Sequence, residues 1–176
     1  MLVTSNLMQE RSQLEKSFYA AFDVPLLRQD CELITKGKSH AHFEGAGRHF
    51  EVYKTSIRGF DFALCFPQEG FKKERLTGKK TWKELMNLLK AIKNPLIPPF
   101  EFLTIKDSQN LVLVQPFGLL KKKSNSDTSV SLGELIDKFQ EQLKAQHLYL
   151  GDIPQIRYIG ELPFIHDYSE LHELSF

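Results

Sequence analysis

Two glycines that stand one residue apart, Gly45 and Gly47, open a stretch whose residue types could bind phosphate. Glycine has no Cβ, so the backbone can adopt positive φ and come close to a bound group. Exposed N–H groups in such a turn suit phosphate oxygens. The same two glycines before a strand are also typical of a plain hairpin, so this stretch alone leaves both interpretations open.

Acidic side chains farther along the chain could also do chemistry. Asp167 follows a short apolar run, where a buried carboxylate without a partner is costly, and this pattern favours a functional role. Asp152 comes just before Ile-Pro and can instead fix a turn through its side chain. Glu84 stands three residues after Thr81 and can close a capping box at the start of a helix.

Residue types that bind metals are present, but in no recognisable pattern. His40, His42 and His49 do not have the spacing of a metal site, and histidines on a strand or at the surface explain them better. The two cysteines, Cys31 and Cys65, do not form a disulfide framework, which is typical of a reducing compartment.

Length and charge restrict the class of protein. The chain has 176 residues and a formal net charge of +1. That length is enough to bury a core, and the balanced charge predicts no binding to nucleic acid. No signal peptide and no membrane span are expected. The predicted location is the cytoplasm, or a host cell that the protein enters without a cleaved signal peptide.

The first half of the chain predicts one helix followed by an antiparallel meander. Apolar residues at helical spacing and a capping residue predict a helix over residues 5–22. From Cys31 the period changes to two, which predicts strands. These strands are expected at Leu33–Ile34, 50–54 and 60–66, with a turn at Arg58-Gly59.

Helices and strands also alternate in the second half. Thr81 is a good N-cap for a helix that ends at Asn94-Pro95. Apolar runs predict strands at 100–105 and 111–114, and a linker-like segment follows over 115–127. A capping-box pattern at Ser131 starts another helix, and a small hairpin is expected between residues 156 and 167.

This order of elements resembles the N-lobe and catalytic segment of the protein-kinase-like fold. The glycine loop of that family has the form G-x-G-x-x-G-x-V, and its next strand carries V-A-I-K. In this chain Phe50 stands at the third glycine and Cys65 stands at the lysine. The residues that match these two motifs are Gly45, Gly47, Val52 and Ala63.

Later segments are similar to the family in the same order. Glu84 stands where the family has the ion-pair glutamate of its αC helix, and Leu111 to Phe117 resembles the strand and hinge that touch adenine, through Gln115 and Phe117. Leu150-Gly151-Asp152 resembles the start of the catalytic loop. His166-Asp167 resembles the D-F-G region that holds magnesium.

The resemblance implies phosphoryl transfer from ATP. In such a site Asp167 would hold Mg²⁺, with Gln155 as the nearest amide for the second metal position. Asp152 would accept the proton of the acceptor hydroxyl or orient that hydroxyl. Because Cys65 cannot supply a positive charge, we expect Lys54, on the preceding strand, to pair with the phosphates, with Lys72 and Lys73 as alternatives.

The predicted fold class is α+β, with an antiparallel kinase-like N-lobe sheet, an αC-type helix, and a reduced, mainly helical C-lobe with a small hairpin. The predicted divisions are an N-terminal helix over 1–30, the N-lobe over 31–115 and a minimal C-lobe over 116–176. Trimmed kinases of this kind occur among bacterial effectors.

Three hypotheses for the function follow. The first is a minimal kinase-like protein that binds ATP and Mg²⁺ and phosphorylates a protein Ser/Thr hydroxyl. The alternative is a pseudokinase that acts as a scaffold for a protein partner, because the strand lysine and most of the C-lobe are missing. A third hypothesis is an unrelated α+β adaptor. The sequence does not indicate the oligomeric state.

Overall fold

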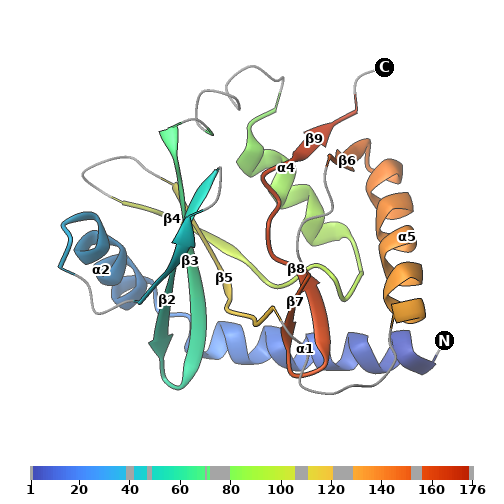
Figure 1. The fold of residues 1–176 in the computed structure, drawn as a ribbon, viewed down its shortest axis with the longest axis horizontal. Helices are drawn as coiled ribbons and strands as arrows, with labels where there is room; N and C mark the ends of the chain where they lie inside the picture. Colours follow the sequence, from blue (N-terminus) through green and yellow to red (C-terminus); the bar gives the residue numbers. More distant parts are fainter. Residues whose placement is uncertain are drawn as a thin grey trace. The chain divides into compact units, whose positions relative to one another are not determined.

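The protein has an α+β fold, as the sequence predicts (Figure 1). The computed structural model describes residues 2–38, 42–46, 49–69, 71, 80–105, 111–120, 129–151 and 156–174. The chain divides into two compact units. Unit 1 comprises Met1–Ser12, Arg75–Pro98 and Gly118–Phe176, and unit 2 comprises Gln13–Glu74 and Pro99–Phe117.

Unit 2 contains a five-stranded antiparallel sheet with the strand order β1-β2-β3-β5-β4. Its first three strands form the predicted meander, and Arg58 and Gly59 make the tight turn between β2 and β3. Gly59 has a φ of 79°, a conformation that favours glycine. The strands are β1 (His42–Ala46), β2 (Phe50–Ile57), β3 (Phe60–Pro67), β4 (Glu101–Thr104) and β5 (Leu111–Pro116).

Two helices precede this sheet in the chain. α1 (Leu2–Ala21) confirms the predicted N-terminal helix. The strand that we predicted at Leu33–Ile34 is wrong, because both residues lie in a second helix, α2 (Val24–Thr35). The side chain of Asp23 caps α2 by accepting a hydrogen bond from the N–H of Leu26 at 3.1 Å. Pro25 fits the first turn of α2, where its missing N–H needs no partner.

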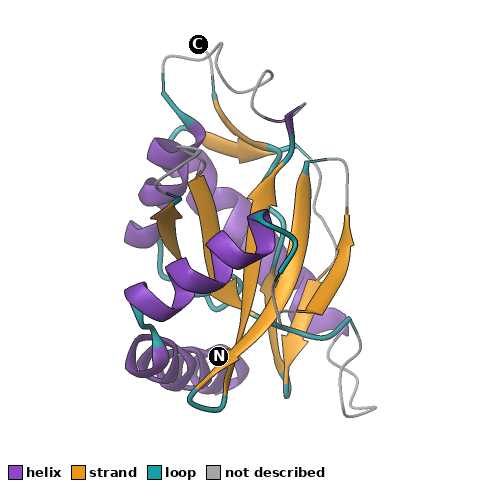
Figure 2. Ribbon diagram, turned by 90° about the vertical axis from the view of Figure 1, so that its left-hand side faces the viewer, coloured by secondary structure: helices purple, strands orange, loops and turns teal. Residues whose placement is uncertain are grey.

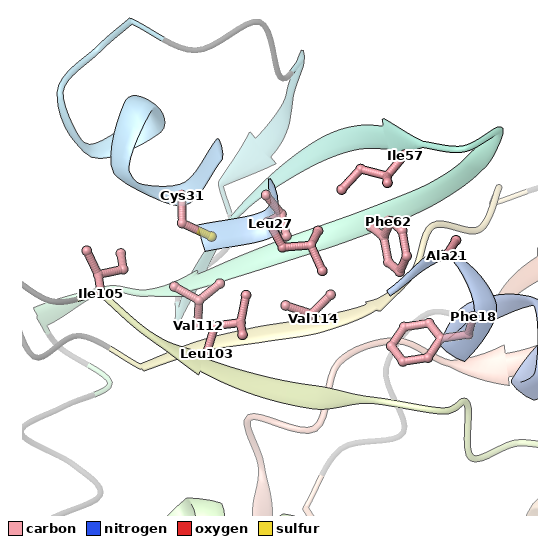
Figure 3. Close-up of a cluster of buried hydrophobic side chains, with 11 residues drawn as sticks. Phe18, Ala21, Leu27, Cys31, Ile57, Phe62, Leu103, Ile105, Val112 and Val114 are labelled. Carbon is pink, nitrogen blue, oxygen red and sulfur yellow. The ribbon is translucent and has the colours of Figure 1, made fainter. Parts of the chain in front are cut away.

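α2 and the end of α1 cover one face of the sheet (Figure 2). Figure 3 shows Phe18 from α1 and Leu27 from α2 packed with Phe62 of β3 and other side chains of the strands. Thr55 of β2 donates a hydrogen bond to the carboxylate of Asp30 in α2 at 2.7 Å, so a polar contact joins the helix to this apolar face. The core of unit 2 therefore lies on the helix side of the sheet.

Unit 1 combines helices with two small two-stranded sheets, in which β6 pairs with β9 and β7 pairs with β8. The β7–β8 pair is the hairpin that the sequence predicts, and α4 and α5 are the two predicted helices. The predicted start of α5 is wrong, because the helix begins at Ser129 and Ser131 lies inside it. The elements are α4 (Trp82–Leu88), which continues into a 3₁₀ turn η1 (Leu89–Ala91), α5 (Ser129–Ala145), β6 (Leu148–Leu150), β7 (Ile156–Ile159), β8 (Leu162–Ile165) and β9 (Leu171–Glu173).

Buried hydrogen bonds tie the segments of unit 1 together. The indole N–H of Trp82 donates to the carbonyl of Tyr168 at 2.9 Å, and the hydroxyl of Tyr168 donates to the carbonyl of Leu96 at 3.2 Å. The side chain of Asn94 donates to Gln142 of α5 at 2.9 Å. Segments that are far apart in sequence thus share one set of buried polar contacts.

In the part of the chain that the structure describes, every helix is too short or too polar to span a membrane.

Candidate functional site

Four of the predicted nucleotide-contacting residues lie on one face of the sheet in unit 2. Lys54 of β2 pairs with Ala63 of β3, and Ala63 pairs with Gln115 of β5. Residues directly opposite in antiparallel strands point to the same face, and so do residues two positions apart. Val52 therefore shares this face with them. We call Val52, Lys54, Ala63, Cys65, Leu113 and Gln115 the Lys54 face; it is opposite to the helix-covered face that holds Phe62 and Val114.

Gly45 reaches the same part of the sheet from β1. It pairs with Val52, beside a β-bulge that separates it from the pair formed by Phe43 and Tyr53. Its φ of 155° is one that residues with a Cβ rarely adopt, so glycine is required at this bulge. Gly47, the second predicted glycine, lies outside the described residues.

Lys54 has two close neighbours on its own sheet. Its Nζ lies 3.7 Å from Oδ2 of Asp61, and 4.9 Å from the centre of the Phe117 ring. The N–H of Phe117 donates to the carbonyl of Asp61 at 3.0 Å, which holds the ring near that carboxylate. An ammonium over an aromatic face is a favourable cation–π contact. The structure therefore brings the predicted residues Lys54 and Phe117 together.

Asp61 is a residue that our sequence analysis missed. It pairs with Ser56 across the β2–β3 hairpin, which makes it a diagonal neighbour of Lys54. Diagonal neighbours on one face are within reach of long side chains. The sequence contains the information needed to find Asp61. A two-residue turn at Arg58-Gly59 fixes which residues of β2 and β3 face each other, and this places Asp61 close to Lys54.

Gln115 and Cys65 form the buried centre of the Lys54 face. The side-chain amide of Gln115 donates to the sulfur of Cys65 at 3.6 Å. Both side chains are buried, and sulfur is a weak acceptor. Cys65 stands where the resemblance expects a lysine, so the positive charge on this face comes from Lys54 on the neighbouring strand.

Glu84 is part of the capping box of α4. The N–H of Thr81 donates to its carboxylate at 3.0 Å, and the N–H of Glu84 donates to the Thr81 hydroxyl at 3.2 Å. Of the two roles that the sequence left open for Glu84, the structure shows the capping role. The side chain is exposed at the start of the helix, where a carboxylate also interacts favourably with the helix dipole.

Asp167 makes a local contact as well. Its Oδ1 accepts a hydrogen bond from the N–H of Ser169 at 2.8 Å, which is the pattern of an Asx turn. Burial lowers the pKa of the adjacent His166 to about 4; the positive charge of Arg157 adds to this, and Asp167 opposes it. His166 is therefore neutral at pH 7, beside a partly buried carboxylate.

The predicted catalytic-loop residues, Asp152 and Gln155, lie outside the described residues. The N–H of Gly151, the last described residue before them, donates to the carbonyl of Glu170 at 2.9 Å. Within the described ranges, no group of three or more His, Cys, Asp or Glu side chains could hold a metal ion. His42 is exposed in β1, and His49 is buried beside the ring of Phe71.

Comparison with known proteins assigns no family. No protein-family model matches the chain, and the search of curated proteins gave no relative.

Proposed function

We propose that this chain is a minimal, atypical kinase-like protein that binds ATP and Mg²⁺ and transfers the terminal phosphoryl group to a protein Ser/Thr hydroxyl. The observation that carries the proposal is the grouping on the Lys54 face. Residues predicted from four separate segments to contact a nucleotide are neighbours there: Gly45, Val52, Lys54, Ala63 and Gln115. The succession of β2, β3, α4, β4, β5, α5 and the β7–β8 hairpin also supports the proposal, because these elements follow the order that the resemblance uses.

The chemistry of this face suits a nucleotide. Val52, which is partly exposed, offers an apolar contact for a planar base, and the amide of Gln115 could satisfy a polar edge. Ala63 and Gln115 are buried, so the proposal requires that nucleotide binding uncovers them. Lys54 supplies a compact positive charge for phosphate oxygens. Near it, Gly45 permits the backbone to come close to an anion, because it has no side chain.

The metal and transfer steps are assigned by the resemblance. Asp167 and Gln155 would hold Mg²⁺, and Asp152 would orient the acceptor hydroxyl. A single carboxylate is compatible with this role, because Mg²⁺ is commonly held by one or two carboxylates together with phosphate oxygens and water. The Asx turn occupies Oδ1 of Asp167 with one N–H donor, and a carboxylate has further acceptor positions for a metal.

A second candidate function is a catalytically inactive kinase-like scaffold that binds another protein. Two observations favour the scaffold. The carboxylate of Glu84 is engaged in a capping box, and a buried cysteine stands where an active kinase would have its strand lysine. In this alternative the fold persists without phosphoryl transfer.

Thermal unfolding with ATP, in the presence and absence of Mg²⁺, tests nucleotide binding. A ligand that binds only the folded protein at 100 times its Kd adds about 2.7 kcal/mol of stability. We expect this stabilisation in the unchanged chain and its loss in Lys54→Ala. Lys36→Ala is the matched control, because Lys36 is an exposed lysine of the same unit at the end of α2.

The outcomes separate the candidates. No stabilisation of the unchanged chain at millimolar ATP would contradict nucleotide binding and favour the scaffold. Stabilisation without transfer of labelled phosphate to any protein would favour a nucleotide-binding pseudokinase. Equal stabilisation of Lys54→Ala and the unchanged chain would remove Lys54 from the site.

A further inference from the structure

The ammonium of Lys54 points away from the glycine end of the Lys54 face. Along β2, Gly45 pairs with Val52, whereas Asp61 pairs with Ser56. Lys54 lies between these two positions, and its Nζ is 3.7 Å from the carboxylate of Asp61. Two residues along a strand span roughly 6.6 Å. To come this close to Asp61, the side chain of Lys54 must extend along β2 toward the hairpin turn.

Asp61 is well placed to keep Lys54 in this position. The hydroxyl of Ser56 donates to Oδ1 of Asp61, while Oδ2 faces Lys54. The ring of Phe117 contacts the same ammonium. Within the described ranges, Asp61 is the acidic side chain that pairs with Lys54. The ammonium is therefore held by one carboxylate and one aromatic ring.

We propose that Asp61 is a resting counter-ion that competes with nucleotide phosphate for Lys54 and so sets the affinity of the site. This inference rests on the proposed nucleotide binding. A carboxylate and a phosphate oxygen accept hydrogen bonds from the same ammonium. In the absence of nucleotide the pair with Asp61 neutralises Lys54. Phosphate binding at the glycine end requires the ammonium to leave that carboxylate.

If Asp61 helped Lys54 to bind phosphate, its removal would change the affinity in the opposite direction. If the carboxylate oriented Lys54 for phosphate, as an ion-pair acid does in an active kinase, its removal would weaken binding. As a competitor, its removal strengthens binding. Both groups are partly exposed, with side-chain exposures of 32% for Lys54 and 46% for Asp61. Pairs of this kind contribute modestly, so the expected change is about three- to fivefold.

Asp61→Asn is the sharpest substitution for this test. The amide oxygen of asparagine can still accept the hydrogen bond from Ser56, and the backbone carbonyl that binds Phe117 is unchanged. The substitution removes the negative charge with little change in shape. Glu51→Gln is the charge-matched control, because Glu51 lies on β2, the strand of Lys54, but on the opposite face, where it accepts a hydrogen bond from Tyr53 at 3.3 Å.

The experiment measures the affinity for Mg²⁺-ATP by calorimetry at one fixed salt concentration. We expect Asp61→Asn to bind roughly three- to fivefold more tightly than the unchanged chain, and Glu51→Gln to bind with unchanged affinity. In the Lys54→Ala background, we expect Asp61→Asn to give no gain, because the competition acts through the ammonium.

Other outcomes overturn the inference. If Asp61→Asn binds Mg²⁺-ATP as tightly as the unchanged chain, or more weakly, the competition is excluded while the proposed nucleotide binding still holds. A gain that persists without Lys54 would mean that Asp61 repels phosphate directly, which also contradicts competition for the ammonium. If the unchanged chain and every variant fail to bind Mg²⁺-ATP, the proposed function itself fails, and the inference fails with it.

Discussion

Several acidic residues of this chain accept hydrogen bonds from backbone N–H groups close to them in sequence. Asp23 caps α2, Glu84 closes the capping box of α4, and Asp167 forms an Asx turn. Short acidic side chains bond readily to neighbouring backbone groups. Asp61 differs, because its carboxylate faces side chains of the preceding strand. At the scale of single residues, it is therefore the acid whose contacts bear most directly on Lys54.

At the same scale, we predict that the thiol of Cys31 is unreactive in the folded protein. Burial raises the pKa of Cys31 to about 12; the negative charges of Asp30 and Glu32 add to this, and Arg28 opposes it. Only the thiolate reacts with alkylating reagents. Iodoacetamide at pH 8 should therefore modify Cys31 only after unfolding in urea, as measured by peptide mass spectrometry.

The unfolded chain serves as the control for this labelling, because it exposes both cysteines to the same reagent. Native modification of Cys31 at a rate close to that of the urea-unfolded chain would contradict the burial that we describe.

At the scale of elements, α2 depends on how it begins. Asp23 caps its first turn, and the same carboxylate pairs with Arg58 of the β2–β3 turn at 3.1 Å. Pro25 lies in the first turn of the helix. The cap fixes where α2 starts, and hence which of its side chains face the sheet. Leu27 and Cys31 are one turn apart and share that buried face.

We predict that Asp23→Ala lowers the free energy of unfolding by about 1–2 kcal/mol, the usual cost of losing an N-cap. Asp23→Asn should cost less, because asparagine is also a good cap and only the ion pair with the exposed Arg58 is lost. Urea unfolding followed by circular dichroism measures both variants. If the two substitutions cost the same, the ion pair contributes more than the cap.

At the scale of the whole molecule, each unit is assembled from separate segments of the chain. Unit 1 combines three segments, and buried contacts join them. The N–H of Ile165 donates to the carbonyl of Leu96 at 2.8 Å, and the side chain of Arg11 donates to the carbonyl of Ile97 at 2.7 Å. The hydrogen bond from Trp82 to Tyr168 belongs to the same set. No single stretch of sequence supplies a complete unit 1.

We therefore predict that residues 118–176 alone do not fold stably. The fragment would lose the partners that residues 75–98 supply to Tyr168, Ile165 and Gln142, and buried polar groups without partners are costly. Thermal unfolding of the fragment, followed by circular dichroism, should show no cooperative transition, whereas the full chain should show one. A cooperative transition in the fragment would contradict this prediction.

Much of the secondary structure could be predicted because its causes are local. Alternating side chains gave β2 and β3, the Thr81–Glu84 pair gave the start of α4, and Arg58-Gly59 gave the turn. The prediction of a strand at Leu33–Ile34 was wrong for a reason that is also local. Asp23 followed by Pro25 is the signal of an N-cap and a first turn, and it starts a new helix two residues after α1 ends.

By itself, then, the sequence determined the α+β class, the approximate positions of most helices and strands, and the residue types that could contact a nucleotide. Only the tertiary structure decided that β5 lies between β3 and β4, and that Gln115 of β5 extends the row formed by Lys54 and Ala63. The physical reason is distance along the chain. Caps, turns and periodicity depend on neighbouring residues, whereas strand order depends on packing between segments dozens of residues apart.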